Sequence, residues 1–288
     1  DLPFFEITLA MALVHFKKEQ CDYVILETGM GGRLDATNVV TPLLAVITNI
    51  GFDHQAFLGN TLAEIASEKA GIIKESIPVI CGEEREELIE FFRRKAKSLN
   101  APITWIHTKV EDLSDRLPPY QRKNAAIAIQ ALNLIGINTK KFNVVATWNV
   151  LFEQTGFIGR LFPSGQYTNL WYDASHNADG LTTTMESLRG MGISKPILIF
   201  GASNDKSLAH LSAIDDVIDA WYFCEFTNQR SYRGDQLKQV IDELKLKKTQ
   251  QFNQVNQAIQ AALETRKENQ AILVTGSFFL LSDCQEIQ

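Results

Sequence analysis

Cysteine is scarce in this sequence, and its placement is not that of a bridged protein. Only four cysteines occur among 288 residues, at Cys21, Cys81, Cys224 and Cys284, with no CxxC pair and no regular spacing. All but one lie in or beside apolar runs. We therefore expect buried free thiols in a reducing cytoplasm rather than a disulfide framework.

Long apolar runs and excess positive charge are missing too. No stretch of roughly 18 apolar residues occurs, which argues against a transmembrane helix, and no secretory leader is visible. Lys and Arg number 28 against 34 Asp and Glu, giving a net charge of −6 and a pI near 5.5. This net negative charge argues against non-specific nucleic-acid binding, which needs a basic surface. It does not exclude a local basic pocket for an acidic substrate.

The remaining composition is that of an ordinary globular protein. Hydrophobic residues make up 45% and charged residues 22% of the chain, which allows a sizeable core. At roughly 150 residues per domain, the length predicts about two domains. No internal repeat or low-complexity tract is present.

The first half of the chain alternates strand-like and helix-like patterns. Short apolar runs bounded by Gly, Asn or Pro predict buried strands, and longer periodic stretches predict helices. Thr61 is expected to begin one helix, with Glu64 completing a capping box. The predicted strands are Tyr23–Leu26, Leu43–Thr48 and Ile77–Cys81, and the predicted helices are Phe4–Lys18, Thr61–Ile73, Glu84–Ser98 and a buried Gln121–Ile135.

The alternation begins again after a glycine-containing linker, Gln154–Arg160. We therefore expect an α/β protein of two domains, 1–156 and 157–288, each a mostly parallel sheet flanked by helices. The predicted second-half strands are Leu170–Tyr172, Ile197–Phe200, Ala220–Phe223 and Ala271–Thr275, and the helices are Leu181–Arg189, Gln236–Leu244 and Val255–Thr265.

Residues that follow the strands are the first candidates for function, because open α/β sheets bind ligands beyond the carboxyl ends of their strands. The first predicted strand ends at Glu27 and leads into a segment with three glycines and Arg33, continuing to Asn38. Glycines allow tight turns and close approach to a ligand, although a plain turn is the alternative. A carboxylate that ends a buried strand calls for a cation partner, because burying it unpaired is costly.

The second predicted strand leads to Asp53 and His54. A single His is more often structural than a ligand. When a Glu and a His follow neighbouring parallel strands, however, both face the same crevice. A carboxylate, a neutral imidazole, phosphate oxygens and water form a plausible Mg²⁺ shell. Lys69, near the end of the next predicted helix, has the alternative interpretation of a lysine facing the helix dipole.

These segments carry a resemblance. The stretches Glu27–Asn38, Thr48–Gly59 and Glu64–Ile73 resemble, in order and spacing, the folylpolyglutamate synthases and dihydrofolate synthases of the Mur ligase superfamily. The resemblance implies a Mur ligase-like central domain followed by a Rossmann-like C-terminal domain.

The resemblance also implies roles for residues of the first domain. Glu27 and His54 would bind a magnesium ion, and Lys69 would be carbamylated and help to hold a second one. Lys69 and His54 would thereby be catalytic. Asp35 and Ala36 would contact the substrate.

In the second domain, Gly159-Arg160-Leu161 resembles the family's linker arginine, which reaches the nucleotide phosphates. Arg160 is therefore expected to be catalytic and ATP-binding. The stretch Tyr172–Asn177 resembles the family's Asp-Gly-Ala-His-Asn segment, with Ala174 and Ser175 in place of Gly and Ala. The further roles implied are ATP binding for Asn124 (paired with Gln121 at the adenine), Asp173 and His176, and substrate binding for His176 and Ser277.

A G-x-x-x-x-G-K-[ST] phosphate loop, which such ligases carry, is absent from the 288 residues. In relatives it precedes the region matching Leu2–Phe16, and the segment Val110–Pro119 is also short. We therefore expect the sequence to lack pieces of the natural protein and to be inactive by itself.

The implied reaction uses ATP to convert a folate carboxylate into an acyl phosphate, which the amino group of L-glutamate attacks. Two Mg²⁺ ions, a monomeric state and a cytoplasmic location are expected, without nucleic-acid or membrane partners. The resemblance implies tetrahydrofolate as the acceptor and leaves action on dihydropteroate as well open. Alternatives are a dihydrofolate synthase only, a non-catalytic folate- or nucleotide-binding relative, and, less well matched by Gly29–Asn38, a peptidoglycan-type ligase.

Overall fold

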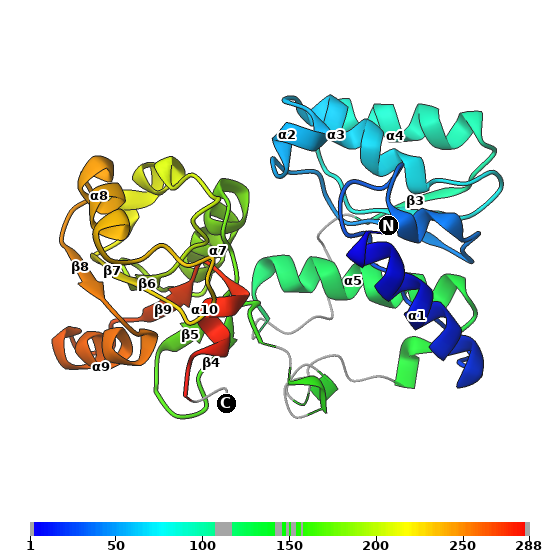
Figure 1. Cartoon of the computed structure of the whole chain (residues 1–288). Helices are drawn as coiled ribbons and strands as arrows, with labels where there is room; N and C mark the ends of the chain where they lie inside the picture. The colour runs from blue at the N-terminus through cyan, green and yellow to red at the C-terminus, as the bar shows by residue number, and fades with distance from the viewer. Residues whose placement is uncertain are drawn as a thin grey trace. The chain divides into compact units, whose positions relative to one another are not determined.

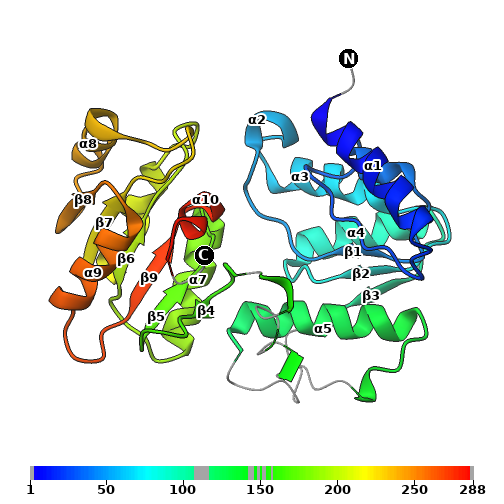
Figure 2. The same cartoon turned by 60° about the horizontal axis from the view of Figure 1, so that its bottom comes forward.

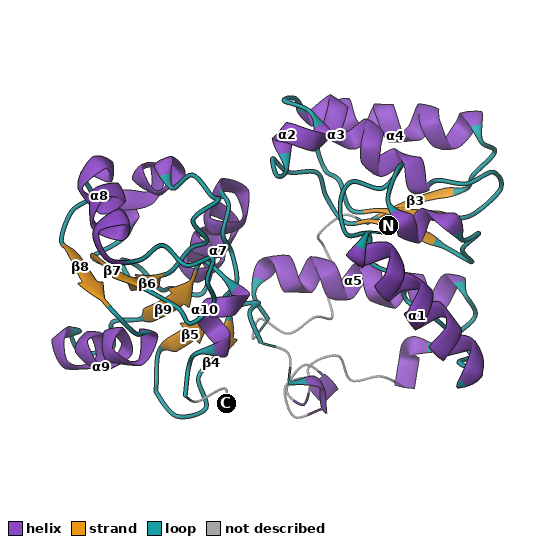
Figure 3. Cartoon of the chain, viewed as in Figure 1, coloured by secondary structure: helices purple, strands orange, loops and turns teal. Residues whose placement is uncertain are grey.

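The computed structural model describes residues 3–106, 117–141, 146–147, 150, 154–156 and 158–285. The chain divides into two compact units, residues 1–111 with 123–142 and residues 112–122 with 143–288. Each is an α/β unit (Figures 1 and 3), so the predicted fold class is confirmed. The domain boundary between 156 and 157 stays a prediction.

Unit 1 contains a three-stranded parallel sheet. Its strands are β1 (Ala45–Ile47), β2 (Val79–Cys81) and β3 (Ile103–Trp105), in the order β1-β2-β3. Val46 pairs with Ile80, and Ile80 with Thr104. Figure 2 shows α4 and α5 on opposite sides of this sheet. Coverage of both faces explains why every residue of β2 is buried.

The helices of unit 1 begin and end close to the predicted positions. Thr61 caps α3, and its capping box with Glu64 is present as expected. On α4 the buried residues Leu88, Phe92 and Ala96 recur at helical spacing and face the core. The helices are α1 (Phe4–Lys18), α2 (Gln55–Leu58), α3 (Leu62–Lys69), α4 (Glu86–Ser98) and α5 (Pro119–Leu134), with a 3₁₀ turn Ala70–Ile72 after α3.

Two predictions about unit 1 were wrong. Residues 23–28 form no strand, because no neighbouring strand among the described residues pairs with them, and Ile25 is 95% exposed. A short apolar run becomes a strand only when a partner supplies ladder hydrogen bonds. The helix predicted at Gln121–Ile135 exists as α5 but is not buried as a whole, since most of its residues are partly or fully exposed.

Unit 2 contains a six-stranded sheet with the order β4-β5-β9-β6-β7-β8. Only β4 runs antiparallel to its neighbour, and every other pairing is parallel. The central strands β6 and β9 are buried throughout. The strands are β4 (Phe162–Pro163), β5 (Leu170–Tyr172), β6 (Ile197–Phe200), β7 (Ala220–Cys224), β8 (Thr249–Phe252) and β9 (Ile272–Thr275).

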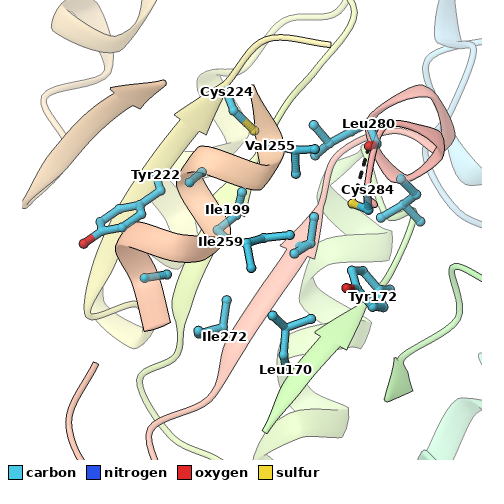
Figure 4. Packing of buried hydrophobic residues seen from close by; sticks show 14 of the residues in the cluster. Leu170, Tyr172, Ile199, Tyr222, Cys224, Val255, Ile259, Ile272, Leu280 and Cys284 are labelled. Atoms are coloured by element: carbon cyan, nitrogen blue, oxygen red, sulfur yellow. Dashed lines mark hydrogen bonds between the residues drawn. The ribbon is translucent and has the colours of Figure 1, made fainter. Parts of the chain in front are cut away.

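Helices cover both faces of this sheet. On one face, Val255 and Ile259 of α9 pack with Ile199 and Ile272 of the sheet (Figure 4). On the other face, Leu188 of α7 belongs to a second buried cluster. The helices are α7 (Ala178–Gly190), a 3₁₀ segment Ala209–Val217, α8 (Gly234–Leu244), α9 (Val255–Thr265) and α10 (Phe278–Ser282).

The four cysteines carry free thiols. Cys81, Cys224 and Cys284 are buried, as predicted, whereas Cys21 is exposed. Burial raises the pKa of the Cys81 thiol to about 11. In the part of the chain that the structure describes, no helix combines the length and apolar character needed to cross a membrane.

Candidate active site

The glycine-rich segment that follows Glu27 lies against α2 and α3. Gly31 has a positive φ of 68°, and a Cβ placed on it would lie 2.8 Å from Cδ2 of Leu58 in α2. A Cβ on Gly32 would lie 3.1 Å from the carbonyl oxygen of Lys69 in α3. The positive φ favours glycine at position 31, and a Cβ at Gly32 would crowd the backbone at the end of α3, so both glycines let the segment lie close to the helices. The structure thus brings together the segments that contain Glu27, His54 and Lys69.

Hydrogen bonds fix the second half of this segment to the end of α3. Arg33 forms an ion pair with Glu68, with 2.9 Å between Nη2 and Oε1. The Asn38 side-chain amide donates to the carbonyl oxygen of Gly71 at 3.1 Å. Lys74 Nζ donates to the carbonyl oxygen of Asn38 at 3.0 Å. The segment is therefore part of a fixed framework rather than a plain exposed turn.

Asp35 organises the turn inside this segment. Its carboxylate accepts hydrogen bonds from the Met30 amide at 2.9 Å and from the amide and hydroxyl of Thr37 at 2.9 and 2.6 Å. Partial burial by itself would raise the pKa of Asp35, but these hydrogen bonds, with one from the Gly29 amide, outweigh burial and hold the pKa below its ordinary value. The structure gives Asp35 a structural task, and its contact with substrate, like that of Ala36, stays a prediction.

Glu27 lies in an exposed, irregular part of the chain, not at the end of a buried strand as expected. No described residue forms a hydrogen bond or ion pair with its carboxylate. Because Glu27 is exposed, its carboxylate does not require a cation partner to compensate for burial. Its carboxylate remains accessible to a ligand that comes from solution.

His54 is the N-cap residue of α2, with φ 49° and ψ 37° in the left-handed region. Non-glycine residues seldom adopt this conformation, although His is enriched among those that do, and such residues cluster at functional sites. The backbone amide of His54 donates to Oδ1 of Asp53 at 2.8 Å. The imidazole is 43% exposed, with Nε2 4.0 Å from Oδ2 of Asp53.

Lys69 is the last residue of α3 and is partly buried. Its ammonium group forms no hydrogen bond or ion pair with the described residues, although the resemblance assigns it a carbamate. Across the described ranges, no group of three or more His, Cys, Asp or Glu side chains lies close enough to hold a metal ion by itself. By residue type, a carboxylate and an imidazole suit an open Mg²⁺ site, in which one or two protein ligands are completed by phosphate oxygens and water.

Sequence reasoning missed Glu83, which follows β2 after Gly82. Only 3% of Glu83 is exposed, and its carboxylate pairs with Arg85, with 2.8 Å between Oε2 and Nη2. Oε2 also accepts the backbone amide of Ile50 at 2.9 Å. The signal was available, because the strand-end rule applied to Ile77–Cys81 points to this Glu.

In unit 2, Arg160 lies near the beginning of α10. Its guanidinium carbon is 5.5 Å from the centroid of the Phe278 ring, a distance at which a cation and an aromatic face attract each other. Gly159 has a φ of 112°, and a Cβ there would lie 2.9 Å from the Phe278 ring. Because the backbone at Gly159 lies close to the Phe278 ring, Arg160 lies beside the segment that contains Ser277.

Asp173 follows β5 and is 1% exposed. Oδ2 accepts the Leu161 amide at 2.9 Å and the Tyr120 hydroxyl at 3.2 Å. Oδ1 accepts the Ser175 amide at 2.8 Å and the Thr184 hydroxyl at 3.2 Å. Both oxygens are thus occupied by protein donors, and contact with a nucleotide ribose stays a prediction.

The remaining predicted residues of unit 2 lie in the segments after β5 and β9. His176 is partly buried, with Nδ1 3.1 Å from the carbonyl oxygen of Ala174. Ser277 caps α10 by accepting the Phe279 amide at 3.1 Å. The two segments are joined, because the Thr275 hydroxyl donates to the carbonyl oxygen of Ser175 at 2.9 Å.

The pair predicted at the adenine lies on α5. Gln121 is buried, with 6% exposed, whereas Asn124 is exposed. The two residues therefore have different surroundings, and the adenine contact of Asn124 stays a prediction.

Two family models match the chain. The Mur ligase middle domain matches residues 4–115, and the Mur ligase, glutamate ligase domain matches residues 159–278. These ranges contain the segments after Glu27 and the segment of Asp173, respectively. Both units are thereby related to Mur ligases.

Similar proteins and structures agree. The dihydrofolate synthase/folylpolyglutamate synthase of Escherichia coli (strain K12) is 31% identical, covering 100% of this chain and 70% of the relative. That of Bacillus subtilis (strain 168) is 29% identical over 98% of this chain and 71% of the relative. The structure of E. coli FolC in complex with DHPP and ADP has a TM-score of 0.76 at 28% identity, covering 98% and 70% of the two chains. By these matches the chain belongs to the dihydrofolate synthase/folylpolyglutamate synthase family of Mur ligases.

Proposed function

We propose that this protein is an ATP-dependent, ADP-forming ligase that joins L-glutamate to a folate-type carboxylate. One observation carries the proposal beyond family membership. The segments of Glu27, His54 and Lys69 meet at Gly31 and Gly32, where an added Cβ would crowd Leu58 of α2 and the carbonyl oxygen of Lys69. A family member that had lost its chemistry would not need to keep these donors on one framework.

The reaction has two steps. The γ-phosphoryl group of ATP is transferred to a carboxylate oxygen of the acceptor, which releases ADP and leaves an acyl phosphate. The amino group of L-glutamate then attacks the acyl carbon, loses a proton and displaces phosphate to leave an amide. Catalysis of this kind is mostly positioning and charge stabilisation.

Glu27 and His54 would hold Mg²⁺, which when bound offsets the negative charge of the phosphates. Glu27 suits this role because its carboxylate is exposed and accepts no hydrogen bond from a described residue. His54 suits it because a left-handed residue at the beginning of α2 presents its imidazole from a defined backbone position. A second Mg²⁺ remains part of the proposal.

Lys69 would carry a carbamate, which replaces an ammonium by an anionic ligand. The motivation is its position: it ends α3, its ammonium has no partner among the described residues, and its carbonyl oxygen lies next to Gly32. A partly buried ammonium without a partner is costly, because its charge is removed from water without compensation. Conversion to a carbamate that binds a cation would remove this cost.

In unit 2, Arg160 would stabilise negative charge on the phosphoryl group. Its position against Phe278 limits the conformations of its side chain. Asp173 fixes the backbone of Leu161 and Ser175, and we propose that it thereby positions Arg160 and His176 for the nucleotide. Asn124 and Ser277 complete the proposed binding of adenine and amino acid.

The acceptor is tetrahydrofolate, with dihydropteroate as a second acceptor. The similar E. coli and B. subtilis proteins carry both names, dihydrofolate synthase and folylpolyglutamate synthase, which favours the bifunctional form. A monomeric state and a cytoplasmic location also belong to the proposal.

The test measures ATP-dependent incorporation of labelled glutamate with dihydropteroate and with tetrahydrofolate. Protein is expressed from the complete coding sequence that contains these residues. Incorporation with both acceptors supports the bifunctional ligase, and incorporation with dihydropteroate alone supports a dihydrofolate synthase. ADP binding without incorporation for any acceptor would favour the non-catalytic alternative.

A further inference from the structure

Glu83 is a buried carboxylate that the proposed reaction does not use. It lies beyond the carboxyl end of β2 with 3% exposed. Oε1 accepts the backbone amides of Glu84 and Arg85, both at 3.0 Å. A buried charge persists only when partners compensate for its lost hydration. The groups that form hydrogen bonds with Glu83 are therefore the groups that Glu83 holds in place.

Arg85 supplies the compensating charge. Its Nε donates to Oε1 of Glu83 and its Nη2 to Oε2, both at 2.8 Å. The same Nη2 also donates to the carbonyl oxygen of Ile50, while the amide of Ile50 donates to Glu83. One ion pair therefore binds both backbone polar groups of Ile50, a residue on another strand-end loop.

That loop leads from β1 to His54. At its beginning, Gly82 donates its amide to the carbonyl oxygen of Ile47 at 2.8 Å, and a Cβ on Gly82 would lie 2.4 Å from the carbonyl oxygen of Thr48. At its end, His54 adopts the left-handed conformation. Such a conformation persists only when its surroundings fix it, and the Glu83–Arg85 pair fixes the residue between these two points.

We propose that Glu83 and Arg85 are positioning residues that set the backbone of the His54 loop, and thereby the imidazole of His54, for divalent metal binding. This inference rests on the proposed function, in which His54 is a metal ligand. Neither residue is assigned a contact with substrate. The pair acts through Ile50, in the way that residues around a metal site orient its ligands.

The alternative is that the pair only stabilises unit 1. The chain offers a matched control in Glu90 and Arg93 of α4. They are also a Glu–Arg ion pair of unit 1 but are exposed, 49% each, and hold no backbone group of the His54 loop. Glu90→Gln and Arg93→Met therefore remove the same chemical groups without touching the loop.

The experiment uses protein labelled in its histidine rings and Mn²⁺ as the probe. The resonance of His54 is assigned by its loss in His54→Gln, and its broadening is followed as Mn²⁺ is added. In parallel, the Mg²⁺ concentration for half-maximal ligation is measured. The variants are Glu83→Gln, Arg85→Met and Arg85→Lys, with the α4 pair as control.

We expect Glu83→Gln and Arg85→Met to raise both the Mn²⁺ concentration that broadens His54 and the half-saturating Mg²⁺ concentration by about 10- to 100-fold. The α4 variants should match the wild-type protein. Arg85→Lys should lie between them, because lysine keeps the charge but lacks a planar fork that reaches Glu83 and the Ile50 carbonyl together. If the first two variants do not fold, the metal dependence of Arg85→Lys distinguishes a positioning role from a purely structural one.

The proposal is overturned if the variants melt at lower temperature but keep wild-type metal dependence, or if Mn²⁺ does not broaden His54 in the wild-type protein. Absence of ligation in the wild-type protein would refute the proposed function instead. In that case, Mn²⁺ broadening of His54 that is lost in Glu83→Gln would still support the positioning role.

Discussion

Arg33 and Glu68 are joined twice, once through their side chains and once through their backbones. Nε of Arg33 lies 3.1 and 3.2 Å from the two carboxylate oxygens of Glu68, and Nη2 lies 2.9 Å from Oε1. The amide of Arg33 donates to the carbonyl oxygen of Glu68 at 2.8 Å. Because Lys69 is the next residue, movement of the glycine-rich segment and of Lys69 is coupled.

The first prediction concerns Gly71, which lies under Arg33. A Cβ on Gly71 would lie 2.3 Å from Cβ and 2.4 Å from Cα of Arg33. Gly71→Ala must therefore displace backbone, and we expect a loss of about 1–3 kcal/mol in the free energy of unfolding, measured by urea denaturation. Gly190→Ala at the end of α7 is the control, since its Cβ would meet only Cγ of Pro119 at 3.6 Å. Equal stability of the two variants would contradict this packing.

The second prediction separates activity from stability at Glu27. Glu27→Gln should abolish ligation but change the free energy of unfolding by no more than about 0.5 kcal/mol, because the carboxylate is exposed. Glutamate incorporation and thermal melting are the measurements, with Glu75→Gln, another exposed site, as control. The losses from Glu27→Ala and His54→Ala should be strongly non-additive if both side chains hold one ion. Near-normal turnover in Glu27→Gln would refute the metal assignment.

The third prediction concerns the modification of Lys69. With ¹³C-labelled bicarbonate, the protein should show a carbamate carbon resonance that disappears in Lys69→Ala and persists in Lys74→Ala. Lys74 is a suitable control because its ammonium is already engaged by the carbonyl oxygen of Asn38. Lys69→Ala should lose ligation and regain part of it with acetate. Identical spectra for the wild-type protein and Lys69→Ala would exclude carbamylation.

The fourth prediction tests the network around Asp173. Asp173→Asn replaces one acceptor oxygen by an NH₂ group, so at least one pair of donors loses its partner. We expect a loss of about 2–4 kcal/mol in the free energy of unfolding of unit 2, followed by hydrogen exchange in β5 and β9.

Tyr120→Phe provides the graded comparison. Burial and the negative charge of Asp173 raise the pKa of Tyr120, so the phenol stays protonated and donates its hydrogen bond at 3.2 Å. Its removal should cost about 1 kcal/mol. If Asp173→Asn cost no more than Tyr120→Phe, the amides of Leu161 and Ser175 would not depend on the carboxylate.

The fifth prediction is a pH dependence of stability that originates at Glu83. Burial alone would raise its pKa, but hydrogen bonds from the Arg85 side chain and from the amides of Arg85 and Ile50 outweigh burial and lower the pKa to about 2. The folded pKa is thus below the ordinary value of 4.5. The stabilisation is fully present above pH 4.5 and is lost as the pH falls toward 2.

The size of this contribution is on the order of 2 kcal/mol, after allowance for the solvent exposure of Arg85. Urea midpoints measured between about pH 6 and pH 3 should fall more steeply for the wild-type protein than for Glu83→Gln. Glu90→Gln should follow the wild-type slope, because its ion pair is exposed. Parallel slopes for wild type and Glu83→Gln would show that the carboxylate titrates normally.

Local patterns predicted most of the fold. The bounds of Phe4–Lys18, Leu170–Tyr172 and Val255–Thr265 match the structure at both ends, since each shows a clear period or apolar run. The polar strand β8 was not predicted, because Thr249–Phe252 lies at the sheet edge and buries little. Tyr23–Leu26 was predicted wrongly, because strand propensity does not show whether a partner strand is present.

The sequence proposed the candidate site as a set of positions, whose roles stay predictions, and could not give the geometry around them. Strand-end reasoning identified Glu27 and His54, and the resemblance added Lys69 and Arg160. Neither kind of reasoning predicted that Gly31 would lie against Leu58. A contact between residues distant in sequence produces no periodic pattern in the local sequence. Both also missed Glu83, whose role depends on an amide 33 positions away.

The strand order of unit 2 has a consequence for the synthesis of the chain. β5 and β6 do not pair with each other, because β9 lies between them. During translation, residues 170–200 leave the ribosome well before residues 272–275. Until then β5 and β6 lack β9, the strand with which both pair. Pairing between such distant segments is slow, and open strand edges aggregate. The vulnerable moment of biogenesis should therefore fall before Ile272 emerges, and a ribosome stalled earlier would hold a nascent unit without its central strand.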